Sequence, residues 1–309
     1  MKIYLQKIII GTVLAAAVFA SCTENKFNSK KQINVISRED GSGTRGAFIE
    51  FFGIEKKNAN GKKIDCTTEE AAITNSTAVM LTSVAGDNYA IGYVSLGSLN
   101  DSVKAVKIDG AFPSVQNINN GTYKISRPFN VAVKENLSAA ARDFLDYILS
   151  ENGQQVVNAN KYIKVVSPLR QSSGQADSTT VNSCSTIDVS SYTSTKPSGK
   201  VVVAGSSSVS PLMEKLIESY KTVNPNAKIE LQTSDSTTGV TNTINGMCDI
   251  GLSSRSLKDS EKAQGVKEVT IAVDGIAVVV NKANPVEILT KAQVDAVYTG
   301  NITKWNELN

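Results

Sequence analysis

Residues 33–48 (INVISREDGSGTRGAF) join an arginine to a turn of small residues, and together these residue types can hold an anion. Arg38 can offer two parallel N–H donors to a tetrahedral oxyanion. In the turn, Gly41 and Gly43 let backbone N–H groups approach a ligand, while Ser42 and Thr44 add hydroxyl donors. The apolar residues on either side predict a buried strand and then a helix, whose N-terminus adds positive partial charge. The segment therefore predicts an oxyanion-binding loop.

Two other readings of this turn stay open at this point. Gly41, Gly43 and Gly46 also fit the Gly-x-Gly-x-x-Gly pattern of dinucleotide-binding folds. Three charged residues, 38–40, stand where that pattern expects a hydrophobic strand, so we favour the oxyanion loop. A plain glycine-rich turn is the remaining alternative.

Three further turns rich in hydroxyl groups each follow a predicted strand: residues 205–211 (GSSSVSP), 233–239 (TSDSTTG) and 253–255 (SSR). Open α/β sheets bind ligands just beyond the carboxyl ends of their strands. We therefore expect these turns to converge with Arg38 into a cradle for an anion. Each turn taken singly is equally consistent with a simple helix cap.

Composition excludes several classes of function. The chain has 309 residues, of which 41% are hydrophobic and 20% charged, as is typical of an ordinary globular protein. The formal charge of +3, without a basic segment, argues against a nucleic-acid binder. Histidine is absent, which removes Ser-His and Cys-His nucleophile pairs and His-ligated zinc. We expect no catalysis, no metal site and no cofactor.

Residues 1–22 have the form of an export signal, with Lys2 and Lys7 before an apolar stretch at 8–20. The end of this segment, FASC, resembles a bacterial lipobox, which implies lipidation of Cys22 and a polar tether over residues 23–31. The alternative is an accidental cysteine after an ordinary signal. The remaining cysteines have no CxxC spacing and favour neither a disulfide framework nor a metal cluster; they are Cys66, Cys184 and Cys248.

Periodicity predicts the other elements. Strands are expected at 89–95, 103–108, 123–134, 200–204, 228–231, 249–252 and 271–281, and helices from 67, over 138–157, and after 210, 239 and 290. Residues 167–200 are crowded with small polar side chains, which is typical of a linker.

At this point the chain resembles the phosphate-binding proteins that serve bacterial phosphate ABC transporters. The matching segments are 33–48, 89–97, 201–212, 234–240, 249–255, 274–281 and 289–305, together with the helix that ends near 162. The resemblance implies an α/β, two-lobed fold like that of the type II periplasmic binding proteins, with mixed sheets flanked by helices.

The order of these segments is rotated relative to the usual family arrangement, which implies a circular permutation with the old ends joined through the linker 167–200. Permutation is tolerated where termini lie close together on the surface. One lobe is then expected to comprise 32–124 plus 281–309, and the second 125–280, with crossing strands at 123–134 and 271–281.

The resemblance also implies the ligand contacts. They fall on Arg38, Ser42, Gly43, Thr44, Ser207, Ser208, Ser236 and Ser254. Asp40 would orient Arg38, and Arg255 would add a positive donor beside Ser254. Some relatives carry an aspartate in place of Ser254, where it accepts the proton of the ligand. Asp235 is our substitute for that acceptor; the alternative is that it only caps the following helix.

These observations favour a lipid-anchored, monomeric protein on the extracytoplasmic face of the membrane that captures inorganic phosphate and delivers it to a permease. Binding of sulfate, molybdate or another tetrahedral oxyanion is the first alternative. A serine hydrolase would need a Ser-Lys arrangement, for which the sequence places no lysine. A surface adhesion or scaffold protein on the same fold is the third alternative.

Overall fold

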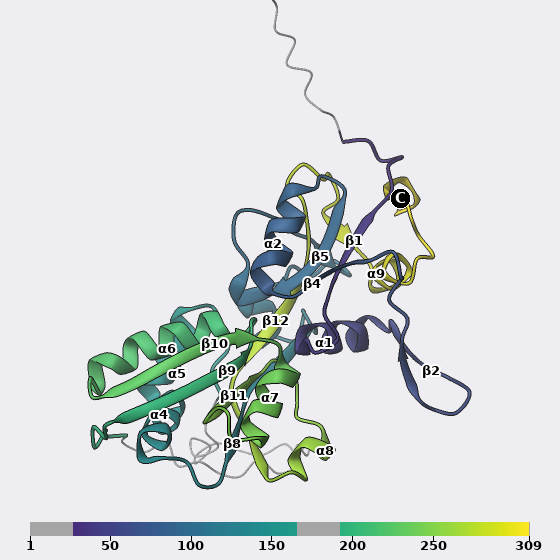
Figure 1. The fold of residues 1–309 in the computed structure, drawn as a ribbon. Coiled ribbons are helices and arrows are strands. Elements are labelled where there is room, and N and C mark those ends of the chain that lie inside the picture. Colours follow the sequence, from purple (N-terminus) through teal and green to yellow (C-terminus); the bar gives the residue numbers. More distant parts are fainter. Residues whose placement is uncertain (1–26, 166–191, 309) are drawn as a thin grey trace, which may run out of the picture.

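The computed structural model describes residues 27–165 and 192–308 (Figure 1). The predicted signal with Cys22, residues 23–26 of the tether, Cys184 and most of the linker lie outside this part of the chain. No helix among the described residues is both long and apolar enough to cross a membrane.

The described chain alternates between short strands and helices. The strands are β1 (Asn34–Arg38), β2 (Glu55–Lys57), β3 (Lys63–Asp65), β4 (Ala72–Thr74), β5 (Ala90–Ser95), β6 (Lys104–Ala105), β7 (Lys107–Ile108), β8 (Ser126–Lys134), β9 (Gly199–Ser206), β10 (Ala227–Ser234), β11 (Ile250–Ser253), β12 (Val266–Val280) and β13 (Ile288–Leu289). The helices are α1 (Gly43–Phe52), α2 (Thr77–Gly86), α3 (Val115–Asn119), α4 (Ala139–Leu149), α5 (Glu151–Ala159), α6 (Ser210–Val223), α7 (Ser236–Ile244), α8 (Asp259–Lys262) and α9 (Lys291–Tyr298), with 3-10 turns at η1 (Leu96–Ser98) and η3 (Trp305–Leu308).

One mixed sheet runs through the molecule in the order β10-β9-β11-β8-β12-β5-β1-β4. The long strand β12 pairs with β8 along its first part and with β5 along its second, both antiparallel. The strands at each end of the sheet pair in parallel, β10 with β9 and β4 with β1. The α/β fold with a mixed sheet flanked by helices is therefore confirmed.

Two large hydrophobic cores lie along this sheet. One contains Phe129 and Ala272; the other contains Ile125 and Ile276, so the chain passes from one core to the other at the start of β8 and again within β12. We call residues 126–165 and 192–275 the serine lobe, and residues 27–125 and 276–308 the arginine lobe. The chain leaves the arginine-lobe core close to the predicted domain boundary at 124/125, and it returns to that core a few residues before the predicted boundary at 280/281. The division into domains stays a prediction.

The apolar run in β12 is buried on both faces of the sheet. Ile276, Val278 and Val280 pack with α1 and α9, while Ala277 and Val279 pack with α2. Successive side chains of a strand point to opposite faces, so a strand covered on both sides reads as a continuous apolar run. This is why residues 271–281 read as a continuous apolar strand, without alternating apolar and polar side chains.

Several predicted elements are wrong in detail. No helix begins at residue 67; instead Thr68 donates to the Tyr298 carbonyl, and α2 begins at Thr77 after the Ser76 cap. The single helix predicted over 138–157 is two helices, because Ser150 ends α4 and caps α5. The predicted strand 103–108 splits into β6 and β7, which pair with β12 and β13. A contact with helix α9 accompanies the first of these differences, and pairing with distant strands explains the third.

Candidate anion-binding site

Arg38 ends β1 and is buried beneath the contact between the two lobes, with 2% of its side chain exposed. Its Nε and Nη2 donate to the two carboxylate oxygens of Glu39 at 2.8 and 2.7 Å. Nη2 also donates to Ser207 Oγ at 3.0 Å, and Ser207 belongs to the serine lobe. The guanidinium is thus held by its neighbour and reaches across to the opposite lobe.

Hydroxyl groups from both lobes meet beside Arg38. Thr44 Oγ1 and Ser208 Oγ are 2.7 Å apart, and Thr77 Oγ1 lies 3.1 Å from Ser208 Oγ. The backbone N–H of Thr77, at the start of α2, donates to Ser207 Oγ at 3.2 Å. Thr44, Thr77 and Ser208 are buried. The first turns of two helices, α1 and α2, therefore contact the same pair of serines.

A second group of serines continues this cluster within the serine lobe. The Ser254 backbone N–H donates to Ser236 Oγ at 3.0 Å, and Ser206 Oγ donates to Ser254 Oγ at 3.0 Å. Gly43 of the arginine lobe lies against them: a Cβ there would stand 2.6 Å from Ser236 Oγ and 2.8 Å from Ser254 Oγ. The absence of a side chain at Gly43 is what allows the lobes to meet here.

Taken together, the cluster offers a small anion many neutral donors, one arginine whose Nη1 and Nη2 face the hydroxyl groups, and almost no access for water. The structure brings together Arg38, Gly43, Thr44, Ser207, Ser208, Ser236 and Ser254, which were predicted from segments far apart in sequence. Ser42 is buried at the start of α1, where its Oγ accepts from the Arg45 backbone N–H at 3.3 Å. That each of these residues contacts a ligand stays a prediction.

The chain has clear relatives. A profile of the PBP superfamily domain matches residues 8–152 and 190–309. The phosphate-binding protein PstS 2 of Streptococcus agalactiae is 49% identical over 302 residues, which cover 97% of this chain and 96% of the relative. The chain belongs to the PstS family of phosphate-binding proteins. The family indicated by the sequence is thus confirmed.

Two further comparisons agree with this assignment. PstS 2 of Streptococcus pneumoniae is 42% identical over 284 residues, covering 92% of this chain and 90% of that protein. A crystal structure of a phosphate-binding protein of a phosphate ABC transporter from S. pneumoniae has a TM-score of 0.64 and 43% identity, and covers 90% of this chain and all of that one. These PstS relatives share the segment order of this chain; the circular permutation relative to other members stays a prediction.

Asp40 does not orient Arg38, which corrects that prediction. Its side chain is 96% exposed and lies 3.5 Å from Arg45 Nη1. The Ser42 backbone N–H donates to the Glu39 carbonyl, so residues 39–42 form a tight turn with Asp40 at its outer corner. Glu39, next to Arg38 in sequence, is the carboxylate that holds the guanidinium.

Asp235 and Arg255 are both engaged within the serine lobe. Asp235 caps α7, accepting from the Thr238 backbone N–H at 2.9 Å and from Thr238 Oγ1 at 2.5 Å. Arg255 donates to both carboxylate oxygens of Glu261, at 2.7 and 2.9 Å. The structure thus provides the cap that was the alternative reading of Asp235. The guanidinium of Arg255 therefore binds Glu261 and not a serine of the cluster.

Sequence reasoning missed Thr77, Arg127 and Asp274. Thr77 follows β4 in another small polar turn, a weak signal for a fifth binding turn. Arg127 and Asp274 are charged residues next to the apolar runs of their strands, which is a stronger signal because a buried charge needs a specific partner. Arg127 Nη1 donates to the Ser254 carbonyl at 3.2 Å.

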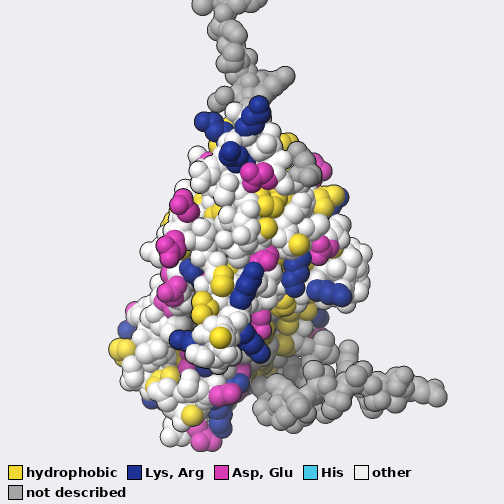
Figure 2. All heavy atoms as spheres, turned by 90° about the vertical axis from the view of Figure 1, so that its right-hand side faces the viewer, with side chains coloured by type: hydrophobic (Ala, Val, Ile, Leu, Met, Phe, Trp, Pro, Cys, Tyr) yellow, Lys and Arg dark blue, Asp and Glu magenta, His cyan; other side chains and the backbone are white. Residues whose placement is uncertain are grey.

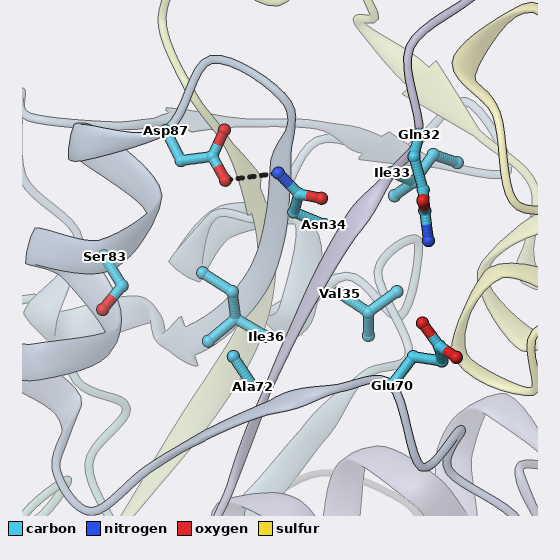
Figure 3. A pocket seen from close by; sticks show the side chains of 9 residues that line it. All are labelled: Gln32, Ile33, Asn34, Val35, Ile36, Glu70, Ala72, Ser83 and Asp87. Carbon is cyan, nitrogen blue, oxygen red and sulfur yellow. Dashed lines mark hydrogen bonds between the residues drawn. The ribbon is translucent and has the colours of Figure 1, made fainter.

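A separate cavity of about 420 Å³ lies beside β1, and Figure 3 shows its lining. Asn34 in this wall donates to Asp87 at 2.7 Å, and Glu70 is the second acid there. The lining contains no lysine or arginine and shares no residue with the hydroxyl cluster. The hydroxyl cluster, which contains Arg38, is therefore the better candidate for an anion-binding site than this cavity.

The two described cysteines are free thiols. Cys248 is buried in the serine lobe, and burial raises the pKa of its thiol. Cys66 is partly exposed. Among the described residues, no group of three or more histidine, cysteine or acidic side chains could hold a metal ion.

Proposed function

We propose that this PstS-family protein captures inorganic phosphate between its two lobes and delivers it to the permease of an ABC transporter. The observation that carries the proposal is the buried cluster in which Arg38 and Thr44 of one lobe meet Ser207 and Ser208 of the other. In a site closed to water, each donor that meets the anion counts, because an unmet buried polar group costs about 1–3 kcal/mol. The names of the streptococcal relatives support phosphate as the ligand.

The test is titration calorimetry with phosphate, sulfate and molybdate. We expect phosphate to bind with a saturable signal at one site per chain and excess sulfate not to displace it. Tight binding of sulfate or molybdate with no heat from phosphate would instead identify the first alternative ligand class.

The same proposal treats the protein as a binder and not an enzyme. The cluster serines have hydroxyl groups and Arg38 as neighbours, and the chain contains no histidine that could act as their base. Turnover of a phosphate ester by the purified protein would contradict this and support the hydrolase reading.

We further propose that Cys22 is lipidated, and that the protein works as a monomer on the extracytoplasmic face of the membrane. Cys22→Ser should release the protein from the membrane fraction of expressing cells; full retention would argue against the anchor.

Acidic and basic side chains are interspersed on the face of the molecule in Figure 2, which supports the absence of nucleic acid among its partners.

Phosphate is expected to compact the protein in solution. Arg38, Gly43 and Thr44 contact serines of the opposite lobe, and the lobes are joined by β8 and β12 near 126–128 and 273–275. A ligand that binds donors of both lobes favours the closed arrangement, as in other hinged binding proteins. Small-angle scattering should therefore give a smaller radius of gyration with saturating phosphate than without it. An unchanged radius would place the whole site within one lobe.

Asp235→Asn is expected to leave phosphate affinity and sulfate rejection near those of the parent between pH 6 and pH 9. Its carboxylate already binds Thr238, and asparagine is an equally good helix cap. Asp235→Ala removes the cap and should lower the free energy of unfolding by about 1 kcal/mol. The measurements are calorimetric competition and urea unfolding. Sulfate competition gained by Asp235→Asn would show that Asp235 accepts the phosphate proton after all.

A further inference from the structure

Two charged residues lie inside the strands that join the lobes. Arg127 on β8 and Asp274 on β12 are register partners in the antiparallel ladder, and 3% and 1% of these residues are exposed. A charge buried this deeply is costly unless it is paired and hydrogen-bonded. Neither residue is a predicted ligand contact, so their presence at the junction needs another explanation.

The contacts of the pair connect the anion site to the opposite lobe. Arg127 Nη1 donates to the Ser254 carbonyl at 3.2 Å, and Nη2 donates to Asp274 Oδ2 at 3.4 Å. Asp274 Oδ1 in turn accepts from the Gly97 backbone N–H at 3.3 Å. Ser254 belongs to the serine lobe and Gly97 to the arginine lobe. The pair therefore links a serine of the site to the far side of the junction.

The charge of Arg127 is less fully balanced than that of Arg38. Arg38 shares two hydrogen bonds of 2.7 and 2.8 Å with Glu39, whereas Arg127 meets Asp274 at a single distance of 3.4 Å. Among the described residues, Arg127 Nε is buried without a hydrogen-bond partner. Burial, together with the nearby charge of Arg38, lowers the pKa of Arg127 to about 10, so the guanidinium stays charged at neutral pH. Arg127 thus places a positive charge that is only partly balanced by Asp274 next to the Ser254 carbonyl.

We propose that Arg127 is a positioning residue of the phosphate site, which fixes the Ser254 turn and adds a second positive charge behind it, while Asp274 offsets that charge and so limits the affinity. This inference rests on the proposed function. A transport protein must release its ligand to the permease, and a counter-charge at the junction keeps binding from becoming too tight. Contact with Gly97 would also make the strength of the pair depend on the angle between the lobes.

The test compares two variants that should change phosphate affinity in opposite directions. Asp274→Asn keeps the shape and the acceptor for Gly97 but removes the negative charge, so phosphate should bind about 5- to 10-fold more tightly. Arg127→Gln removes the positive charge and the donor to Ser254, so phosphate should bind at least about 10-fold more weakly. Arg127→Lys should recover part of that loss. Calorimetry gives the affinities, and stopped-flow dissociation should be slower for Asp274→Asn.

Glu135→Gln is the matched control, because it removes a carboxylate at the other end of the same strand pair, where Glu135 binds Lys267 on the surface. Its phosphate affinity should equal that of the parent. A purely structural role for the pair predicts that both junction variants weaken binding; that result, or unchanged affinity in Asp274→Asn, would overturn the inference. If Arg127→Gln does not fold, the phosphate affinity of Asp274→Asn is sufficient to test the inference, because a disrupted fold would weaken phosphate binding and not tighten it. A parent that binds no phosphate would instead overturn the proposed function.

Discussion

The Arg38→Ala protein is expected to bind phosphate at least about 100-fold more weakly than the parent, a loss of about 3 kcal/mol. The substitution removes the guanidinium, whose Nη1 donates to Thr77 Oγ1 and whose Nη2 donates to Ser207 Oγ. It also leaves the Glu39 carboxylate, now unpaired, beside the anion, and like charges repel. The loss should therefore exceed that of any single serine-to-alanine change in the cluster. Titration calorimetry at fixed ionic strength measures it.

Two further variants separate these causes. Arg38→Ala combined with Glu39→Gln should recover part of the affinity, because the repelling carboxylate is gone. Arg142→Ala, which removes an exposed arginine on α4, should bind phosphate as the parent does. Near-normal affinity in Arg38→Ala would mean that the hydroxyl cluster is not the phosphate site.

Gly43→Ala is expected to block closure of the lobes and weaken phosphate binding by at least about 10-fold. The added Cβ would lie 2.6 Å from Ser236 Oγ, 2.8 Å from Ser254 Oγ and 2.9 Å from the Ser254 carbonyl carbon. Real Cβ atoms do not approach other atoms so closely, and the backbone of Ser254 cannot swing away as a flexible side chain could. Gly43 is the first residue of α1, so alanine should not disturb the arginine lobe itself.

Gly46→Ala is the control for this variant, because it lies in the same helix with nothing within 4 Å of its added Cβ. It should keep the phosphate affinity of the parent and raise the free energy of unfolding by up to about 1 kcal/mol. Scattering should show that Gly46→Ala compacts with phosphate while Gly43→Ala does not. If Gly43→Ala binds and compacts like the parent, the bound state does not bring Gly43 against Ser254.

The hydroxyl groups of the cluster bind one another in the structure, and each could instead bind an anion. In the structure Thr44, Thr77 and Ser208 bind among themselves at 2.7 to 3.1 Å. A hydroxyl can rotate its proton toward a new acceptor, and a hydrogen bond to a charged oxygen is about twice as strong as one between neutral groups. Phosphate entry would therefore replace neutral hydrogen bonds with stronger ones and leave no donor unmet.

The local features of this protein could be predicted from the sequence by itself. The strand, turn and helix around Arg38 and the hydroxyl-rich turns after β9, β10 and β11 depend on residues close together in the chain. The absence of histidine and the resemblance to phosphate-binding proteins likewise needed no coordinates. Conformational preferences and motifs are local, so short windows are enough to read them.

Only the tertiary structure decided which of these groups meet. It assigned Glu39 rather than Asp40 to Arg38, because the 39–42 turn points Asp40 outward, and it gave Asp235 its place as the cap of α7. It also paired Arg127 with Asp274, which stand 147 residues apart. The physical reason is that the partner of a buried charge depends on register across the sheet and on lobe contact, and neither leaves a pattern in a short window of sequence.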